Sequence, residues 1–405
     1  MPEKRIVAVF TGNRAEYGLQ YPILRAIAAH PDLDYRLLVS GAHLDPDFGS
    51  SINEILDDGF EIHAKINIEM GKVESVATAQ AIGSGIISIS HELSEIRPDF
   101  LIVYADRFEG LAAVIASTQM NIPTVHVEGG DLTEGGALDD SVRHAMTKLS
   151  HLHMTTNEDA AKRILCMGEE PWRVKVVGLP TLDLIRGGDY ASENELVENF
   201  CLDLDKPILV FTQHSVTTEF QKAGFQIQQS LDALDRFLAM GVQCILTFPN
   251  NDTGSIEITS ALKSFYANHK KKRNQTIFLM KTLGRFRYHG LLALAKNNSV
   301  RIACVGNSSS GIKEAGLFNC PTLNIGTRQN GRLRGKSVLD CDYEKDEIIM
   351  GIERCLFDDD FRDQCRDVQS PYGTGNAGEK IANYLAEIAL DQKLIVKKMT
   401  IKTDI

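Results

Sequence analysis

The sequence predicts an α/β protein made of two Rossmann-like, doubly wound parallel-sheet domains that face a common cleft. Short apolar runs rich in Val and Ile alternate with longer segments of helical period along nearly the whole chain. This alternation is typical of right-handed βαβ units, whose parallel sheet is covered by helices on both faces. The chain has 405 residues, whereas single hydrophobic cores seldom grow beyond about 250–300 residues. We therefore expect two domains.

The first half of the chain shows this alternation from its start. The strands expected there are residues 5–10, 35–40, 99–104, 123–127, 152–156 and 174–178. The helices expected there include residues 15–30, 75–96, 107–119, 139–150 and 158–167. The rhythm then breaks in "GLPTLDLIRGGDYASENEL", where Gly, Pro and a polar run follow one another. We place the domain boundary there, so the N-terminal domain is expected to comprise residues 1–178.

The second half resumes the same alternation near residue 205. The strands expected there are residues 207–212, 242–248, 275–280, 300–305 and 321–325. The helices expected there include residues 217–240, 255–270, 286–297, 309–317 and 346–356. The second domain is expected to comprise residues 179–372. An amphipathic helix should follow near residues 376–391, and the charged tail from Lys393 to Ile405 is expected to be loose.

The composition limits the possible partners and compartments. An apolar fraction of 43% and a charged fraction of 24% are those of an ordinary globular protein. The net charge of −11 argues against a surface that binds nucleic acid or an anionic membrane, although a small basic pocket for a phosphorylated ligand is compatible with it. The apolar run in "MPEKRIVAVF" is too short for a signal peptide or a membrane span. The eight cysteines include no C-x-x-C pair, so we expect a cytoplasmic protein without a disulfide framework or a zinc site.

Polar residues just past the carboxyl ends of parallel strands line the cleft of an open α/β sheet. In "TGNRAEYG", after the first strand, Arg14 could form a forked contact with a phosphate or hold the cleft closed, or could simply be a first-turn residue. "ADRFEG" places Asp106 and Arg107 at the end of strand 99–104, where helix capping by the aspartate is the simpler alternative. Both motifs are therefore candidates for ligand contact.

The segment "HVEGGDLTEGGALDDSVRHAMTK" is the most acidic of these strand ends. Strand alternation places His126 and Glu128 on one face, and the glycine pair after Glu128 would let the backbone bend around a ligand. Within the following helix, contacts at three- and four-residue spacing are available among Asp139, Asp140, Arg143 and His144. Acidic residues also complement a helix N-terminus, but that explains only part of the run. Several carboxylates at one cleft are what proton abstraction and delivery on a sugar ring require.

The second domain has polar groups after successive strands. These groups are His214 in "FTQHSVTTE", Asn250, Asp252 and Ser255 in "FPNNDTGS", Ser308, Ser309 and Glu314 in "GNSSSGIKEAG", and Arg328 in "GTRQNGR". A plain strand-to-helix turn also accounts for the Gly, Asn and Ser of "GNSSSGIKEAG". The alternative is an anion cradle, in which hydroxyl and backbone N–H groups hold a phosphate while Glu314 binds two ribose hydroxyls. Because these groups converge on one edge of one sheet, they predict a nucleotide site.

Two other motifs do not support a function. "GRLRGKS" resembles a P-loop, but Asn330 stands where the first glycine would be needed. "HLH" at residues 151–153 places two imidazoles on one strand face without a third ligand of suitable spacing, so no metal site is expected.

On these residues the chain resembles the UDP-N-acetylglucosamine 2-epimerases, specifically the hydrolysing branch that opens sialic-acid and related nonulosonic-acid pathways. The motifs that carry the resemblance are "TGNRAEYG", "ADRFEG", "HVEGGD", "LDDSVRHAMTKLSHLH", "QHSVTT", "FPNNDTGS", "GNSSSGIKEAG", "GTRQNGR" and "PYGTGNAGEKI". The resemblance implies a fold of the glycosyltransferase-B type. It also implies that residues 373–405 comprise a helix that returns to the N-terminal domain, followed by a tail.

The resemblance further implies a two-stage reaction without metal or nicotinamide. A carboxylate removes the C2 proton while UDP leaves C1 by anti elimination, and water then adds to the 2-acetamidoglucal to release N-acetylmannosamine. The implied acid and base carboxylates are Asp106, Glu128, Asp139 and Asp140. The implied ligands of the diphosphate are Arg14, His214, Ser308 and Ser309, with Glu314 on the ribose. Arg143, Asn250 and Arg328 are implied for the sugar or the cleft. The further candidates for binding the substrate or its UDP group are Arg107, His144, Asp252 and Ser255.

Several alternatives stay open at this stage. The non-hydrolysing branch, which makes UDP-N-acetylmannosamine, typically has Asp-Ser-Gly-Gly where this chain has Asn-Ser-Ser-Ser at residues 307–310. A glycosyltransferase of the same architecture and a non-catalytic UDP-sugar binding protein are further alternatives. The loop between Glu128 and Asp139 is slightly longer than in the animal enzymes, which could admit UDP-2,4-diacetamido-2,4,6-trideoxy-glucose as substrate. The resemblance suggests a homodimer or homotetramer.

Overall fold

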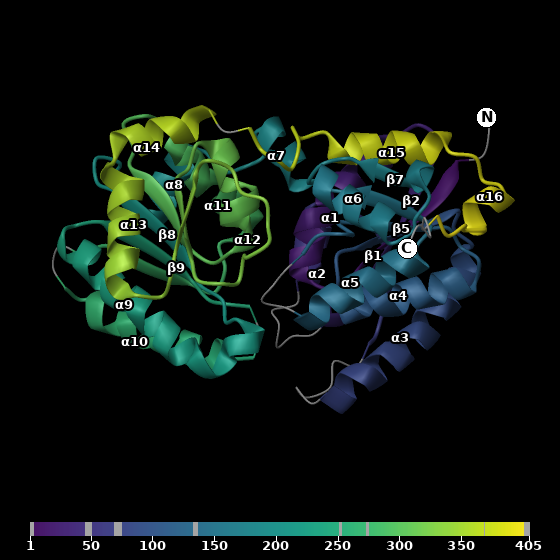
Figure 1. The fold of residues 1–405 in the computed structure, drawn as a ribbon, viewed down its shortest axis with the longest axis horizontal. Helices are drawn as coiled ribbons and strands as arrows, with labels where there is room; N and C mark the ends of the chain where they lie inside the picture. Colours follow the sequence, from purple (N-terminus) through teal and green to yellow (C-terminus); the bar gives the residue numbers. More distant parts are fainter. Residues whose placement is uncertain are drawn as a thin grey trace, which may run out of the picture. The chain divides into compact units, whose positions relative to one another are not determined.

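The computed structural model describes residues 4–44, 51–68, 75–132, 137–250, 253–272, 275–367 and 369–400, and within these ranges it leaves out the side chains of residues 14, 15, 42, 75, 77, 137–139 and 367. Internal contacts divide the chain into two units (Figure 1). The N-terminal unit comprises Met1–Asp131, Leu138–Arg186 and Tyr372–Ile405. The C-terminal unit comprises Leu132–Ala137 and Gly187–Pro371.

The N-terminal unit is built on a parallel sheet, which within the described residues has seven strands in the order β3-β2-β1-β4-β5-β6-β7. The strands are β1 (Arg5–Thr11), β2 (Leu33–Ser40), β3 (Ile62–Ile66), β4 (Phe100–Tyr104), β5 (Thr124–Val127), β6 (Leu152–Thr155) and β7 (Val174–Val176). All residues of β4 are buried, as expected for a central strand that is covered on both faces.

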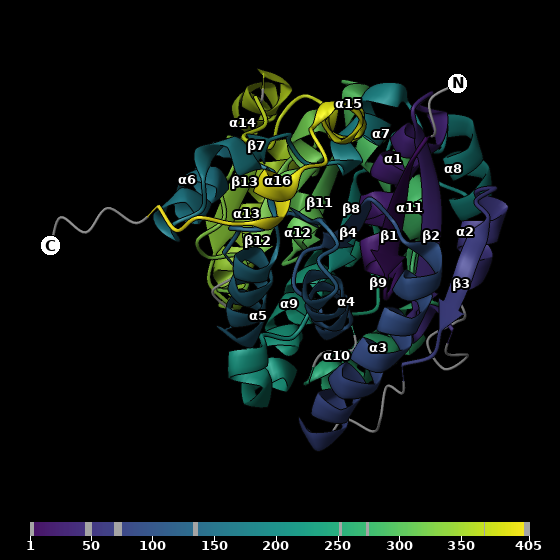
Figure 2. The same cartoon turned by 90° about the vertical axis from the view of Figure 1, so that its right-hand side faces the viewer.

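Helices cover both faces of this sheet. They are α1 (Arg14–Ala29), α2 (Ile52–Asp57), α3 (Ser75–Ile96), α4 (Phe108–Gln119), α5 (Ala137–Leu149), α6 (Glu158–Cys166), α7 (Thr181–Gly187), α15 (Ala377–Glu387) and α16 (Gln392–Ile395), with short 3₁₀ turns η1 (Gly41–His43) and η3 (Pro171–Arg173). Val7 and Val9 pack with α1 and α15, whereas Ala8 and Phe10 pack with α3 and α4. Figures 1 and 2 show these helix pairs on opposite sides of the strands. Alternate side chains of β1 thus point to opposite faces of the sheet and pack into two separate cores.

The C-terminal unit repeats this plan with six described strands in the order β10-β9-β8-β11-β12-β13. The strands are β8 (Ile208–Thr212), β9 (Gln243–Thr247), β10 (Ile277–Met280), β11 (Ile302–Gly306), β12 (Thr322–Ile325) and β13 (Val338–Cys341). The helices are α8 (Glu193–Phe200), α9 (Ala223–Ala239), α10 (Ser255–His269), α11 (Gly284–Ala293), α12 (Ser309–Lys313), α13 (Lys345–Phe357) and α14 (Asp359–Gln364), with 3₁₀ turns η4 (Thr217–Lys222), η5 (Leu294–Lys296), η6 (Ala315–Phe318) and η7 (Cys365–Asp367). One core lies under α9, α10 and α13, and the other under α8 and α11.

The strand order positions the candidate site within each unit. Chain order reverses between β1 and β4 in the N-terminal unit and between β8 and β11 in the C-terminal unit. Ligands of open α/β sheets bind outside the carboxyl ends of the strands at such a reversal. The residues that follow these four strands are therefore the ones that the fold presents to a ligand.

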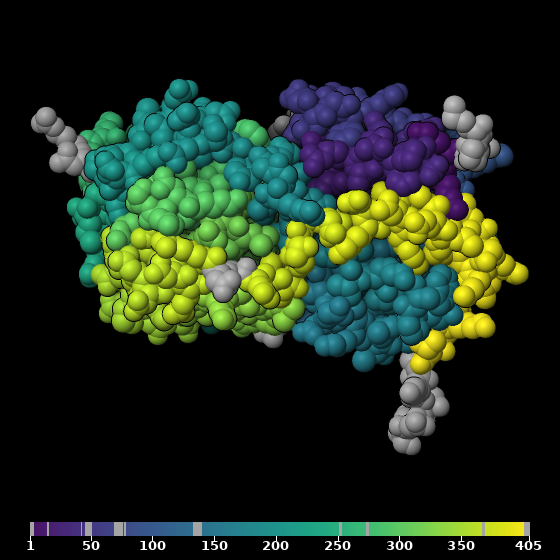
Figure 3. Space-filling model, turned by 90° about the horizontal axis from the view of Figure 1, so that it is seen from above, coloured from purple at the N-terminus to yellow at the C-terminus, as the bar shows by residue number. Residues whose placement is uncertain are grey.

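The structure differs from the sequence-based expectation in a few elements. The strands β3 and β13 and the helices α2, α7, α8 and α14 were not predicted. The helix expected at 217–240 is divided into η4 and α9, and η4 itself contains a kink at Glu219, whose backbone is not helical. The expectation of a loose tail is wrong for its described part. The buried guanidinium of Arg173 donates to the carbonyls of Lys393, Leu394 and Val396. Figure 3 shows the yellow C-terminal segment lying along the surface of the N-terminal unit.

Candidate active site

A buried arginine organises the acidic cluster of the N-terminal unit. Arg143 on α5 is 2% exposed, and its Nη1 donates to Oδ1 of Asp140 at 2.7 Å and to the carbonyl of Asp131 at 2.8 Å. Its Nη2 donates to Oδ2 of Asp106, which follows β4 at the chain reversal. The alternative that Asp106 caps α4 does not hold, because the cap position is Arg107 and no side chain bonds there. One guanidinium thus holds two carboxylates that are 34 residues apart in sequence.

Glu128 lies directly after β5 in a strained conformation. Its φ of 62° lies in the left-handed region, which costs a non-glycine residue about 1–3 kcal/mol and is found mainly at functional sites. Because β5 ends at Val127, strand alternation does not extend to Glu128. The carboxylate is nearly buried, and its Oε2 accepts a hydrogen bond from the hydroxyl of Tyr104 at the end of β4. Tyr104 therefore orients Glu128 at the same sheet edge as Asp106.

The two histidines of this region have different surroundings. Burial lowers the pKa of His126 to about 3, so its ring is neutral. Nε2 of His126 donates to the carbonyl of Ala105 at 2.7 Å and thereby supports the turn before Asp106. Burial also lowers the pKa of His144, and the charge of Asp140 opposes that shift. Nδ1 of His144 has no hydrogen-bond partner among the described residues.

A pair of buried glutamates lies at the same chain reversal and was not singled out from the sequence. Glu16 on α1 accepts from the backbone N–H of Gly12 at 2.8 Å, and neither carboxylate oxygen of Glu109 on α4 has a hydrogen-bond partner among the described residues. Burial raises the pKa of both carboxyl groups, and the charge of Glu109 raises that of Glu16 further. Nε of Arg107 lies 3.6 Å from Oε2 of Glu109. The sequence feature that could have indicated this pair is the acidic residue in the first turn of each helix that follows β1 and β4.

His214 leads the corresponding edge of the C-terminal unit, directly after β8. Its Nδ1 accepts from the backbone N–H of Asn250 at 2.9 Å, so the ring proton must sit on Nε2. Burial and then the charge of Arg328 lower the pKa of His214 well below its ordinary value. The imidazole is therefore neutral and presents one N–H donor. Asn250 contributes its backbone to this arrangement, and its side chain is exposed.

Asn307 connects the ends of β8 and β11 and was missed as a site residue. Its amide oxygen accepts from the N–H of His214 at 2.7 Å, and its amide nitrogen donates to the carbonyl of His214 at 2.9 Å. Its own carbonyl accepts from Arg328 at 3.2 Å. The close approach requires Gly306, whose φ is 127° and where an added Cβ would lie 1.9 Å from the carbonyl oxygen of Thr212. The glycine and serines around Asn307 marked this turn in the sequence, but nothing there set the asparagine apart from an ordinary turn residue.

The serines after β11 join a short network. Oγ of Ser308 lies 2.9 Å from Oγ of Ser310, and Ser309 begins α12. Glu314 ends the same helix, and its Oε2 lies 2.8 Å from Nε2 of His289. Ser255 begins α10 after the left-handed Gly254. The fold thus gathers His214, Ser308, Glu314 and Arg328 at one edge of the C-terminal sheet.

Some predicted residues lie outside the description. Asp252 is not among the described residues, and the side chains of Arg14 and Asp139 are likewise left out. In the described part of the chain, no group of three or more His, Cys, Asp or Glu residues is placed to hold a metal ion. His151 and His153 of the HLH motif instead contact the backbone of Thr124 and the carboxylate of Glu169. No helix in the described ranges has both the length and the apolar character needed to cross a membrane.

Comparison with known proteins agrees with the fold and the motifs. The family model described as UDP-N-acetylglucosamine 2-epimerase matches residues 25–386. A UDP-N,N'-diacetylbacillosamine 2-epimerase (hydrolyzing) from Legionella pneumophila is 33% identical over 97% of this chain and 98% of its own. A UDP-N-acetylglucosamine 2-epimerase from Neisseria meningitidis serogroup B is 33% identical over 87% of each chain. The crystal structure of UDP-GlcNAc 2-epimerase from Neisseria meningitidis bound to UDP-GlcNAc has a TM-score of 0.78, at 18% identity over 95% of this chain and 100% of that one. The predicted glycosyltransferase-B type fold with two parallel-sheet units is confirmed.

Proposed function

From the premise that this chain belongs to the UDP-N-acetylglucosamine 2-epimerase family, we propose that it is a hydrolysing 2-epimerase of a UDP-2-acetamido sugar. The products are UDP and a free 2-acetamido sugar whose C2 configuration is inverted. The observation that carries the proposal is the arrangement of Asp106, Asp140 and Glu128 around Arg143 and Tyr104 at the chain reversal of the N-terminal unit.

The first stage of the proposed reaction is an elimination. A carboxylate takes the C2 proton, the electron pair of that bond forms the C1=C2 double bond, and the C1–O bond breaks as UDP leaves. Asp106, Glu128, Asp139 and Asp140 are the proposed acid and base groups. Arg143 supports this role because it fixes two of these carboxylates and supplies their counter-charge in a buried site.

The second stage adds water to the 2-acetamidoglucal. Hydroxide is delivered to C1, and a proton is delivered to C2 from the face opposite to the one it left. The proposed holders of the departing diphosphate are Arg14, His214, Ser308 and Ser309. The neutral His214 suits this role because its Nε2–H can donate to the charge that develops on the leaving oxygen. Glu314 is proposed for the ribose. Arg143, Asn250 and Arg328 are proposed for the sugar or the cleft. Arg107, His144, Asp252 and Ser255 are proposed more broadly for binding the UDP-sugar.

Two observations favour hydrolysis over release of a UDP-linked epimer. Residues 307–310 read Asn-Ser-Ser-Ser, and Asn307 uses both its amide oxygen and its amide nitrogen on His214. An aspartate at that position could only accept hydrogen bonds. The Legionella relative also carries the word hydrolyzing in its name.

Two sugars are candidates for the substrate. They are N-acetylglucosamine and 2,4-diacetamido-2,4,6-trideoxyglucose, which is the sugar named N,N'-diacetylbacillosamine in the Legionella relative. We further propose a cytoplasmic homodimer or homotetramer, which the resemblance suggests and which light scattering after gel filtration can test.

The test separates the products of each UDP-sugar by anion-exchange chromatography. The proposal expects UDP and an uncharged free sugar to form in equal amounts. A UDP-linked epimer would assign the chain to the non-hydrolysing branch, and tight binding without turnover would indicate a binding protein. The Asp106→Asn variant serves as the control for contaminating activity.

A further inference from the structure

Two consecutive residues of α11, Tyr288 and His289, contact side chains of the candidate nucleotide site. The hydroxyl of Tyr288 lies 2.7 Å from Oγ of Ser310, and Nε2 of His289 lies 2.8 Å from Oε2 of Glu314. Both α11 side chains belong to the same unit as the site, and His289 is almost fully buried. Neither residue was considered from the sequence, because a Tyr-His pair inside a helix carries no motif.

Resting on the proposed function, we propose that Tyr288 and His289 are positioning residues of the UDP site. Tyr288 orients the hydroxyl of Ser308 toward the diphosphate, and His289 orients the carboxylate of Glu314 toward the ribose hydroxyls. The need for such support follows from α12, which has five residues. Helices of this length depend on tertiary contacts, so α12 cannot by itself hold its side chains in place.

The hydroxyls of Tyr288, Ser310 and Ser308 form a chain of contacts in which either atom of each pair can donate. Burial raises the pKa of Cys304 to about 11, so the thiol keeps its proton and can donate to the hydroxyl of Tyr288, 3.4 Å from its Sγ. Burial likewise raises the pKa of Tyr288, which stays a phenol. A diphosphate can only accept hydrogen bonds, so Ser308 would donate to it. Ser308 then accepts from Ser310, whose Oγ is 2.9 Å away, and Ser310 accepts from the hydroxyl of Tyr288.

The contact of His289 selects one tautomer. An ionised carboxylate can only accept, so Nε2 must carry a proton, and Nδ1 is buried with no hydrogen-bond partner among the residues that the structure describes. The imidazole also packs on the ring of Phe318, with centroids 5.4 Å apart. The ring of His289 is therefore packed against Phe318, and its Nε2–H donates to one oxygen of Glu314. That contact sets the rotation of the carboxylate.

The test measures the affinity of the full chain for three probes by calorimetry: UDP, 2',3'-dideoxy-UDP and uridine. Tyr288→Phe removes only the hydroxyl and should weaken UDP about three- to tenfold, the range of one hydrogen bond, while uridine is unaffected. His289→Phe keeps a ring against Phe318 and should weaken UDP by a similar factor but leave dideoxy-UDP unchanged. His289→Gln, which restores an N–H donor, should recover part of the loss. Tyr266→Phe on α10 is the matched control.

The outcomes separate this inference from the proposed function. If the wild-type protein binds UDP and turns over a UDP-sugar, but the α11 variants keep the wild-type ratios of affinity among the three probes, only the positioning role is overturned. A purely structural role would lower the melting temperature and weaken all probes equally, which also overturns it. Wild-type protein without affinity for UDP would remove both proposals.

Discussion

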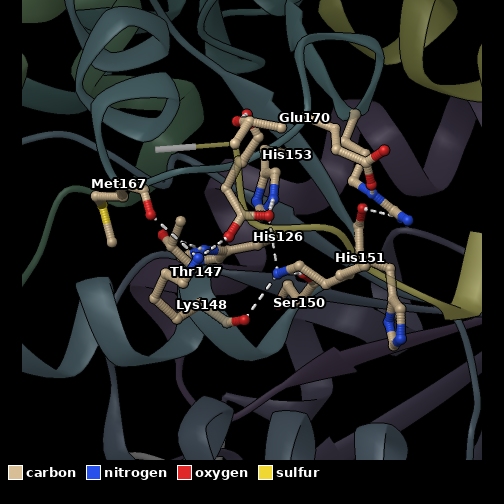
Figure 4. A network of polar contacts seen from close by, with 12 residues as sticks. His126, Thr147, Lys148, Ser150, His151, His153, Met167 and Glu170 are labelled. Carbon is tan, nitrogen blue, oxygen red and sulfur yellow. Dashed lines mark hydrogen bonds and ion pairs between the residues drawn. The ribbon is translucent and has the colours of Figure 1, made fainter. Parts of the chain in front are cut away.

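The sharpest test of the folding argument is the substitution Glu169→Gln in the N-terminal unit. The Glu169 side chain is 1% exposed and receives hydrogen bonds from Nζ of Lys148 at 2.5 Å, Nε2 of His153 at 3.1 Å and Nζ of Lys397 at 2.8 Å. Figure 4 shows the surrounding network, with Lys148 and His153 labelled. Lys397 also donates to the carbonyls of Lys148 and Ser150 at the end of α5, so this cluster joins the C-terminal segment to the helix that carries Arg143.

The magnitude follows from the pKa of Glu169. Burial alone would raise it, but the hydrogen bonds from His153, Lys148 and Lys397 lower the pKa from 4.5 to about 2. At about 1.4 kcal/mol for each pH unit, this difference corresponds to about 3 kcal/mol of stability. Because the folded pKa lies below the unfolded one, this stability is present above pH 4.5 and is lost as the pH falls toward 2. Glu169→Gln should therefore lower the free energy of unfolding by about 3 kcal/mol at pH 7 and by less than half of that at pH 3.

The assay is urea unfolding followed by the fluorescence of Trp172, the single tryptophan. Its indole lies beside the cluster, with the guanidinium carbon of Arg173 4.2 Å and Nζ of Lys393 4.8 Å from the ring centroid. The signal thus reports the N-terminal unit. The exposed Glu158→Gln on α6 is the control, because it removes a carboxylate without a buried contact. A loss no larger than that of the control at pH 7, or a loss that stays constant down to pH 3, would refute the reasoning.

The remaining predictions concern activity and pH. Asp106→Asn and Glu128→Gln should each reduce turnover about 10²-fold or more, the scale of lost acid/base catalysis, while UDP still binds; a parallel loss of UDP affinity would misplace these carboxylates. His214→Ala should weaken UDP binding in calorimetry, and an unchanged affinity would contradict its role on the diphosphate. Because burial raises the folded pKa of Glu16 above its unfolded value, its contribution to stability is present at low pH and lost as the pH rises. Glu16→Gln should therefore flatten the fall of the melting temperature from pH 5 to 9, and an unchanged slope would argue against a buried protonated carboxyl.

The sequence was sufficient for those parts of the fold that depend on local pattern. Central strands such as β4 and β11 are continuous apolar runs, because both faces are buried, and this pattern is visible without a structure. The edge strands β3 and β13 escaped because they are short and partly exposed. The docking of the tail was not predicted because its partners, among them the buried Arg173 and Glu169, lie more than 200 residues away in sequence.

The candidate site shows the same division. The predicted strands were enough to locate the polar residues that follow them, such as Asp106, Glu128 and His214. The side chains that they contact could not be predicted in the same way. The Arg143–Asp106 contact, for example, joins positions 37 residues apart through the sheet rather than within one helix turn. Supporting residues such as Tyr104 and His289 lie in apolar or helical stretches, where a polar side chain has no distinctive spacing.

The central claim is that the 2-acetamidoglucal intermediate adds water rather than UDP, and that this addition gives C2 its inverted configuration. The most direct measurement is proton NMR of the reaction in D₂O with UDP-N-acetylglucosamine and UDP-N,N'-diacetylbacillosamine in separate tubes. The account predicts that at least one substrate gives UDP and a free sugar of manno configuration that carries deuterium at C2. A UDP-linked product, a free sugar that retains its C2 proton, or no turnover of either substrate would contradict it.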